Sequence, residues 1–168
     1  MNLPAPQLMD LLGLQPHPTC GFVHETYRSP LAVPASALPS GYGGPRTLGG
    51  ALCFLVTPQA PVRLHRIRSD QMYHHYLGAA LQVLLLHPDG RGEVRVVGPD
   101  LAAGMRPYLL VPGGAFHAAR LAGGGDYALL GTSVWVRPEP ADVEMGDPER
   151  LMASYPSLRD EVRAFAGR

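Results

Sequence analysis

Residues 63–78, RLHRIRSDQMYHHYLG, place three histidines, a glutamine and two tyrosines in a segment whose polar and apolar side chains alternate. Such alternation is typical of β-strands, in which successive side chains point to opposite faces of a sheet. The segment also raises a functional question: whether these histidines bind a metal, move protons for a substrate, or only fill a polar interior.

The rest of the chain repeats this strand pattern. Short apolar segments separated by Gly, Pro and Asp turns occupy residues 21–28, 50–56, 71–77, 81–87, 92–98, 106–112, 116–122 and 127–136. Strands at this spacing, with a hairpin turn at HPDGRG (87–92), predict a closed barrel or sandwich. No segment of helical spacing interrupts them, which argues against a parallel βαβ sheet.

Helical spacing is confined to the two ends of the chain. PQLMDLLGL (6–14) predicts a short helix that stops at Gly13. DPERLMASY (147–155) predicts a second, with Asp147 as its N-cap and Pro148 in its first position, and PSLRDEVRAFAG (156–167) a third. We therefore expect one domain over residues 1–168: a barrel core of about 46–136, an N-terminal extension of 1–45 that includes a mobile loop at 37–46, and C-terminal helices in 147–168.

Composition excludes several classes of partner. The 168 residues carry 14 basic and 14 acidic side chains, so no nucleic-acid or acidic-lipid partner is indicated. The longest apolar runs, such as LQVLLL (81–86), fall far short of the roughly 20 residues of a membrane helix. Cys20 and Cys53 form no disulfide framework, and no secretory signal is evident, so we expect a cytoplasmic protein.

Two motifs carry a family resemblance. His65, Gln71 and Gly78 are spaced H-x-x-x-x-x-Q-x-x-x-x-x-x-G, and GMRPYLLVPGGAFH (104–117) contains P-x-G-x-x-H. These resemble the two motifs of the cupin superfamily, in which the first supplies His, His and Glu and the second a final His. With HPTCGFVHETYRS (17–29), GDYALLGTSV (125–134) and YPSLRDEV (155–162), the chain is similar along nearly its whole length to the cupin-5 family, a domain of unknown function. The resemblance implies an all-β fold, a double-stranded β-helix (jelly-roll) barrel with short N-terminal and C-terminal helices.

The metal-binding pattern of the superfamily is incomplete. Ile67 occupies the second histidine position and Gln71 the glutamate position, and neither can supply an imidazole or a neutralising carboxylate. The resemblance implies that family members usually keep the glutamate and carry glutamine where this chain has His117, as if the two positions were exchanged. We expect no metal and no cofactor; were a metal bound, His65, Gln71 and His117 would be its ligands, with His75 as a further candidate.

Strand alternation extends the candidate site. If Gln71 points inward, as the resemblance implies, then Tyr73 and His75 do too, while His74 faces outward. Together with His65 and His117 these side chains could transfer protons, because histidine titrates near neutral pH and tyrosine can act as an acid. Metal-free cupins that are similar in fold, the sugar-nucleotide 3,5-epimerases, use a His base and a Tyr acid. The alternative, that these residues only line a wet interior, stays open.

Further residues are candidates for substrate binding: Arg63, Arg28, Tyr108 and Arg120. An arginine pointing inward could meet an anionic group, whereas solvated strand ends, or an ion pair between Arg28 and Glu25, are the structural alternatives.

Two functional classes follow. The first is a metal-independent isomerase, epimerase or lyase acting on a small polar, sugar-like metabolite; the second is a non-catalytic barrel that only binds its ligand. A metal-dependent oxygenase is a weaker third, and the sequence leaves open whether the protein is an enzyme. We also expect a homodimer formed through N-terminal strands such as GALCFLV (50–56).

Overall fold

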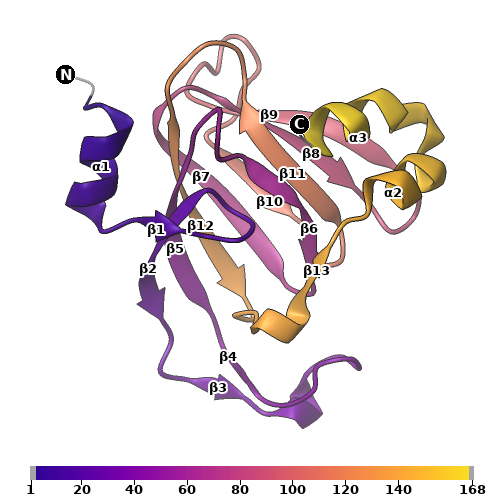
Figure 1. Cartoon of the computed structure of the whole chain (residues 1–168). Helices are drawn as coiled ribbons and strands as arrows, with labels where there is room; N and C mark the ends of the chain where they lie inside the picture. Colours follow the sequence, from indigo (N-terminus) through magenta and orange to yellow (C-terminus); the bar gives the residue numbers. More distant parts are fainter. Residues whose placement is uncertain (1–2, 167–168) are drawn as a thin grey trace.

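Two antiparallel sheets face one another in the computed structural model, which describes residues 3–166 (Figure 1). The six-stranded sheet has the order β1 (Gln15–Pro16), β2 (Phe22–Arg28), β5 (Gly50–Val56), β12 (Ala128–Trp135), β7 (Asp70–Gly78) and β10 (Tyr108–Val111). The five-stranded sheet has the order β13 (Val143–Met145), β6 (Val62–Ile67), β11 (Phe116–Leu121), β8 (Leu81–Leu86) and β9 (Gly92–Val97). The predicted all-β barrel is confirmed.

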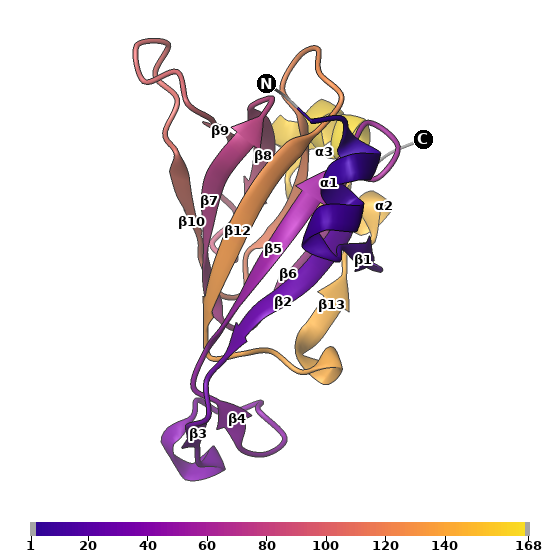
Figure 2. The same cartoon turned by 90° about the vertical axis from the view of Figure 1, so that its left-hand side faces the viewer.

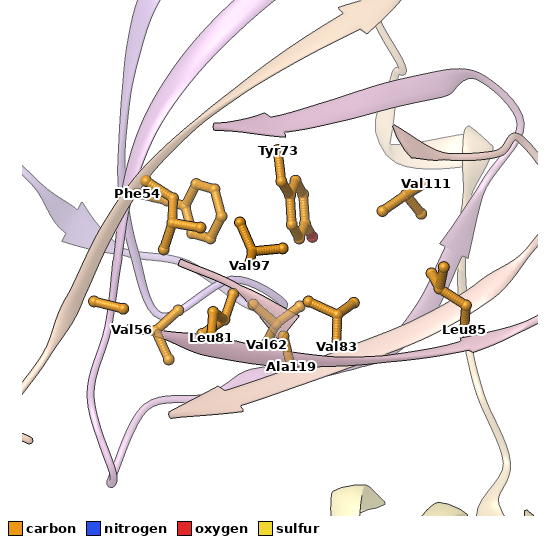
Figure 3. Close-up of a cluster of buried hydrophobic side chains, with 12 residues drawn as sticks. Phe54, Val56, Val62, Tyr73, Leu81, Val83, Leu85, Val97, Val111 and Ala119 are labelled. Atoms are coloured by element: carbon orange, nitrogen blue, oxygen red, sulfur yellow. The ribbon is translucent and has the colours of Figure 1, made fainter. Parts of the chain in front are cut away.

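The core lies between the sheets. Phe54 and Tyr73 extend from the six-stranded sheet toward Leu81, Val83 and neighbouring side chains of the other sheet (Figure 3). Strand β8 is apolar on both faces because it is covered twice. Its residues Leu84 and Leu86 point the other way, into a second cluster beneath the C-terminal helices.

Helices form at both ends of the chain, where the sequence predicts them, and cover the outer faces of the two sheets. Helix α1 (Ala5–Leu12) packs on the six-stranded sheet and ends at Gly13, whose φ of 62° is the left-handed conformation that glycine adopts readily. Helices α2 (Pro148–Ser154) and α3 (Arg159–Ala166) cover the five-stranded sheet (Figure 1). The Asp147 carboxylate caps α2 by accepting hydrogen bonds from the backbone N–H groups of Glu149 and Arg150, at 3.0 and 3.2 Å. None of the helices within residues 3–166 is long and apolar enough to cross a membrane.

Several short elements escaped sequence analysis. Strands β3 (Ala32–Val33) and β4 (Arg46–Thr47) form a small hairpin that projects beyond the barrel (Figures 1 and 2). The 3₁₀ turns are η1 (Ala35–Ala37), η2 (Pro140–Asp142) and η3 (Pro156–Leu158). The hairpin is tied to the barrel by a buried ion pair in which Arg46 Nε lies 2.7 Å from Asp142 Oδ2.

Candidate functional site

A cavity of about 670 Å³ opens between the two sheets, bounded by the start of β5, the end of β6 and the segment that follows β12. Its walls are mainly apolar: Val23, Leu52, Phe54, Ile67, Val134, Val143 and Met145. Its most buried polar lining residues are each no more than 6% exposed: Thr19, His65, Gln71, Tyr73 and Thr132. A mostly apolar pocket with a few convergent polar groups is the usual form of a small-molecule site.

Histidines from adjacent strands meet at the inner end of this cavity. His117 on β11 pairs directly with His65 on β6, which brings their ring centroids to 4.2 Å. The Gln71 side chain reaches across from the opposite sheet, and its Nε2 lies 3.2 Å from His117 Nε2. Thr132 donates its hydroxyl to Gln71 Oε1 at 3.5 Å. Gln71 and His117, the two positions that the family resemblance implies to be exchanged, are therefore in direct contact.

The backbone fixes the protonation of His65. Its Nδ1 lies 2.6 Å from the carbonyl oxygen of Arg63, which can only accept, so Nδ1 carries the proton and Nε2 presents a lone pair. Burial lowers the pKa of His65 and nearby His17 lowers it further, while the Arg63 carbonyl acts in the opposite direction. The ring is neutral at pH 7 and has the properties of a general base.

His117 is fully buried and does not line the cavity. Its Nδ1 has no hydrogen-bond partner within residues 3–166. Burial, and then the proximity of His65, lower the pKa of His117 well below its usual value, and the Ala115 carbonyl acts in the opposite direction. The amide nitrogen of Gln71 can only donate, so Nε2 of the neutral ring accepts and the proton resides on Nδ1. His117 thus orients Gln71 and acts on a ligand only through its neighbours.

Tyr73 supplies a phenol to the cavity. Its ring is 1% exposed and lies 5.1 Å from that of Phe54 and 6.1 Å from that of His117, measured between centroids. Burial raises the pKa of Tyr73 well above 10, so the hydroxyl keeps its proton. No side chain or backbone group in the described part of the chain holds that hydroxyl, which leaves it available to a ligand.

The segment HPTCG (17–21) contributes lining residues that sequence analysis used only for the family resemblance. His17, Thr19 and Cys20 all border the cavity. Gly21, with φ of 60°, allows this close approach, because a Cβ there would overlap the carbonyl oxygen of Leu55. The pKa of the Cys20 thiol is raised to about 11, because the effect of burial exceeds the opposite effect of a hydrogen bond with Thr19. The thiol therefore stays protonated and is a poor nucleophile.

Charged groups line the mouth of the cavity in a balanced set. Glu25 Oε2 lies 2.7 Å from Arg28 Nη2, and Glu25 Oε1 lies 2.6 Å from Arg137 Nε. Arg137 Nη1 also lies 3.3 Å from Glu139 Oε1. The hydrogen bond from Arg28 is the main cause that holds the pKa of Glu25 below its usual range. Arg28 thus borders the cavity, as one interpretation of the sequence predicted, and also forms the ion pair with Glu25 that was the other interpretation. Nothing in the sequence indicated that Arg137 belongs to the site.

The structure does not bring the remaining candidates to the cavity walls. His75 lies two residues, about 7 Å, beyond Tyr73 along β7, and its Nε2 donates to the Ala79 carbonyl at 3.0 Å. Tyr108 is 56% exposed and pairs with outward-facing His74, on the far side of the six-stranded sheet. Arg120 stacks on Phe165 beneath α3. The exposed Arg63 side chain donates a hydrogen bond to the carbonyl oxygen of Pro18. Arg63 therefore serves the site only through its own backbone carbonyl, which bonds to His65.

The residues present do not fit the metal centre of a cupin. Within residues 3–166, no three His, Cys, Asp or Glu side chains are grouped closely enough to hold a metal ion. One nitrogen of His65 is bound to the backbone, and His117 Nε2 is bound to Gln71. Ile67 lies in the cavity wall where a second imidazole of the first motif would stand.

Two facing antiparallel sheets enclose a cavity that is bordered by His65 and Gln71 of the first motif, with His117 of the second motif directly behind them, and this arrangement defines a cupin. The model of the family described as Cupin superfamily (DUF985) matches residues 6–145, and the chain belongs to this family.

Similar proteins support the fold over the whole chain. A Leishmania major hypothetical protein superposes with a TM-score of 0.85 at 27% identity, covering 99% of this chain and 100% of that one. Protein SO0799 from Shewanella oneidensis gives 0.83 at 28% identity, with 99% of each chain covered. The uncharacterized protein YML079W of Saccharomyces cerevisiae is 28% identical over 68% of this chain, and the match spans 60% of the yeast protein. A variant of oxalate decarboxylase from Bacillus subtilis, with a TM-score of 0.51 at 14% identity over 90% of this chain and 37% of that one, shows the fold alone.

Proposed function

We propose that this cupin binds a small, uncharged, sugar-like metabolite in the cavity and moves a proton on it without a metal, as an isomerase, epimerase or lyase. The observation that carries the proposal is the hydrogen bond from His65 Nδ1 to the Arg63 carbonyl, which directs an unprotonated Nε2 to the ligand. His65 is then the base and the un-ionised Tyr73 hydroxyl the acid.

The lining suits such a ligand. Hydroxyl groups of a sugar-like molecule can bond to Gln71 and Thr132, while its C–H faces pack on Phe54 and the aliphatic walls. The paired charges at the mouth favour a ligand without a strong net charge, because each arginine there is already matched by a carboxylate.

A non-catalytic ligand-binding cupin is the second candidate. It is favoured by the hydrogen bonds that Gln71 makes to His117 and Thr132, because they satisfy much of the inner polar surface without a substrate. In this alternative His65 is a hydrogen-bond acceptor for the ligand and removes no proton.

Solvent isotope exchange separates the two candidates. Ligands are first found by a thermal-shift screen of uncharged sugars and hydroxyketones, and each is then incubated with the protein in D₂O. We expect exchange of a carbon-bound hydrogen that His65→Ala slows about 100- to 10,000-fold, the usual contribution of a general base. His74→Ala is the matched control, because His74 faces away from the barrel interior on the same strand as Tyr73. Binding without exchange would establish the non-catalytic alternative.

We also propose a homodimer, but we assign its interface to the outer face of the six-stranded sheet instead of to N-terminal strands such as residues 50–56, because helix α1 packs over part of β5. Helix α1 crosses one part of this face, where it packs against Leu129 at the start of β12, and leaves β7, β10 and the rest of β12 uncovered (Figure 2). Large side chains remain more than half exposed on these strands: Tyr76, Tyr108 and Trp135. Exposed apolar patches of this kind mark protein interfaces.

A further inference from the structure

His17 has its protonation state fixed by its own loop. The backbone N–H of Thr19 donates to His17 Nδ1 at 3.3 Å, and the Thr19 hydroxyl lies 3.2 Å from the same nitrogen. A backbone N–H can only donate, so Nδ1 is an acceptor and the proton of the neutral ring resides on Nε2. The free edge of His17 is therefore a hydrogen-bond donor.

His65 has the opposite arrangement, with its proton on Nδ1 and its lone pair on Nε2. Both imidazoles border the same cavity, and they lie near enough that charge on His17 would disfavour charge on His65. The cavity thus presents one imidazole as a donor and one as an acceptor, each set by a contact with a backbone group.

We propose that His17 is a further catalytic residue, whose Nε2–H binds the carbonyl oxygen of a neutral α-hydroxycarbonyl substrate while His65 Nε2 removes the proton from the adjacent carbon. This rests on the proposed function, in which His65 is the base. A neutral imidazole can polarise a carbonyl in this way without itself losing a proton.

The step balances without any further reactant. The C–H bond breaks, its proton goes to His65 Nε2, and its electron pair forms a C=C bond while the carbonyl π pair moves to the oxygen. The resulting negative charge on oxygen is stabilised by the hydrogen bond from His17 Nε2. The same carbon then regains a proton while the electron pair on oxygen re-forms the carbonyl. A proton from Tyr73 on the opposite face gives the epimer, and the tyrosinate recovers a proton from protonated His65; a proton returned by His65 gives back the substrate, so neither route involves net oxidation or reduction.

The first test reads the two tautomers directly. Long-range proton–nitrogen NMR on ring-labelled protein, slightly above neutral pH, distinguishes the protonated from the unprotonated nitrogen of each histidine. We expect the proton on Nε2 of His17 and on Nδ1 of His65. A proton on Nδ1 of His17 would overturn the inference and would leave the role of His65 untouched.

The second test uses 2-hydroxyacetophenone, a neutral α-hydroxyketone with an apolar ring, and 1-phenyl-1,2-ethanediol, which lacks the carbonyl. We expect only the ketone to shift the His17 Nε2 resonance. In D₂O, the exchange of the α-hydrogens of the ketone should slow at least tenfold in His17→Ala and recover partly in His17→Gln, which keeps an N–H donor.

The outcomes are distinguishable. If the ketone shifts His17 but its α-hydrogens do not exchange, then His17 binds the carbonyl and the proposed proton transfer fails. If exchange depends on His65 but is unchanged in His17→Ala, then the proposed function stands and the role of His17 is refuted. If the ketone leaves the His17 resonance unmoved, the inference is likewise refuted.

Discussion

At the scale of single residues, the role of each histidine follows from which ring nitrogen the surrounding structure already occupies. His65 and His17 each keep one nitrogen free to face the cavity, whereas the two nitrogens of His117 are enclosed. The motifs predicted that His65, Gln71 and His117 point into the barrel, and strand alternation added Tyr73 and His75. It could not reveal that His75 lies too far along its strand, nor that His17 reaches the cavity from a loop that precedes the barrel, because alternation gives a face and not a depth.

The buried imidazoles should make stability depend on pH. Burial lowers the pKa of His65, and burial together with His65 lowers that of His117. The unfolded chain takes up protons at about pH 6.5 that the folded state resists, so stability is fully present above this pH and is lost as the pH falls below it. Melting temperatures measured from about pH 8 to about pH 5 should decline on the acid side.

His117→Leu isolates this effect. The variant lacks the imidazole with the most strongly lowered pKa, so its melting temperature should change less with pH over that range than that of the wild type. Parallel curves for the two proteins would show that His117 is protonated alike in the folded and unfolded states.

At the scale of elements, strands long enough to show alternation were predicted and very short ones were not. The expected helix stops and caps at Gly13 and Asp147 are confirmed because they depend on local backbone chemistry. Strands β3, β4 and β13 have only two or three residues, too few to show alternation, and β13 is held by β6, which is distant in the sequence. The pairing of Arg46 with Asp142, 96 residues away, leaves no pattern in a single sequence.

This buried pair makes a quantitative prediction. The Arg46 and Asp142 side chains are only 8% and 2% exposed. Asp142→Asn should lower the free energy of unfolding by about 3–5 kcal/mol, because it leaves the arginine charge buried without its partner. Urea unfolding measures the loss. Asp160→Asn, at the exposed Arg163–Asp160 pair, is the matched control and should cost about 1 kcal/mol or less.

The same pair has an acid limit. The hydrogen bond from Arg46 is the main cause that holds the pKa of Asp142 below its usual range, and the hydrogen bond from the backbone N–H of Glu139 adds to it. Its contribution to stability is present above about pH 3.9 and is lost as the pH falls through the lowered value. A loss from Asp142→Asn that was no greater than that from Asp160→Asn would contradict the buried pair.

At the scale of the whole molecule, two sheets and their helices bury most of the apolar sequence, whereas Tyr76, Tyr108 and Trp135 on the six-stranded sheet are among the large side chains that stay exposed. Light scattering should give a mass near twice the 18.0 kDa of one chain. Tyr108→Glu combined with Trp135→Glu should reduce it to one chain, because charges in this face oppose its burial. Leu101→Glu, on the exposed loop after β9, should not. A wild-type mass of one chain would refute the dimer.

Elemental analysis tests the central claim, a cavity that works without a metal, most directly. Protein purified without chelator, and then dialysed against zinc, manganese, iron or nickel, should retain far less than one ion per chain, because Ile67 and Gln71 remove two ligands from the first motif. The double variant Ile67→His, Gln71→Glu restores both ligand types and serves as the positive control. About one tightly held ion per wild-type chain would contradict the account and favour a metal-dependent reaction in this cavity.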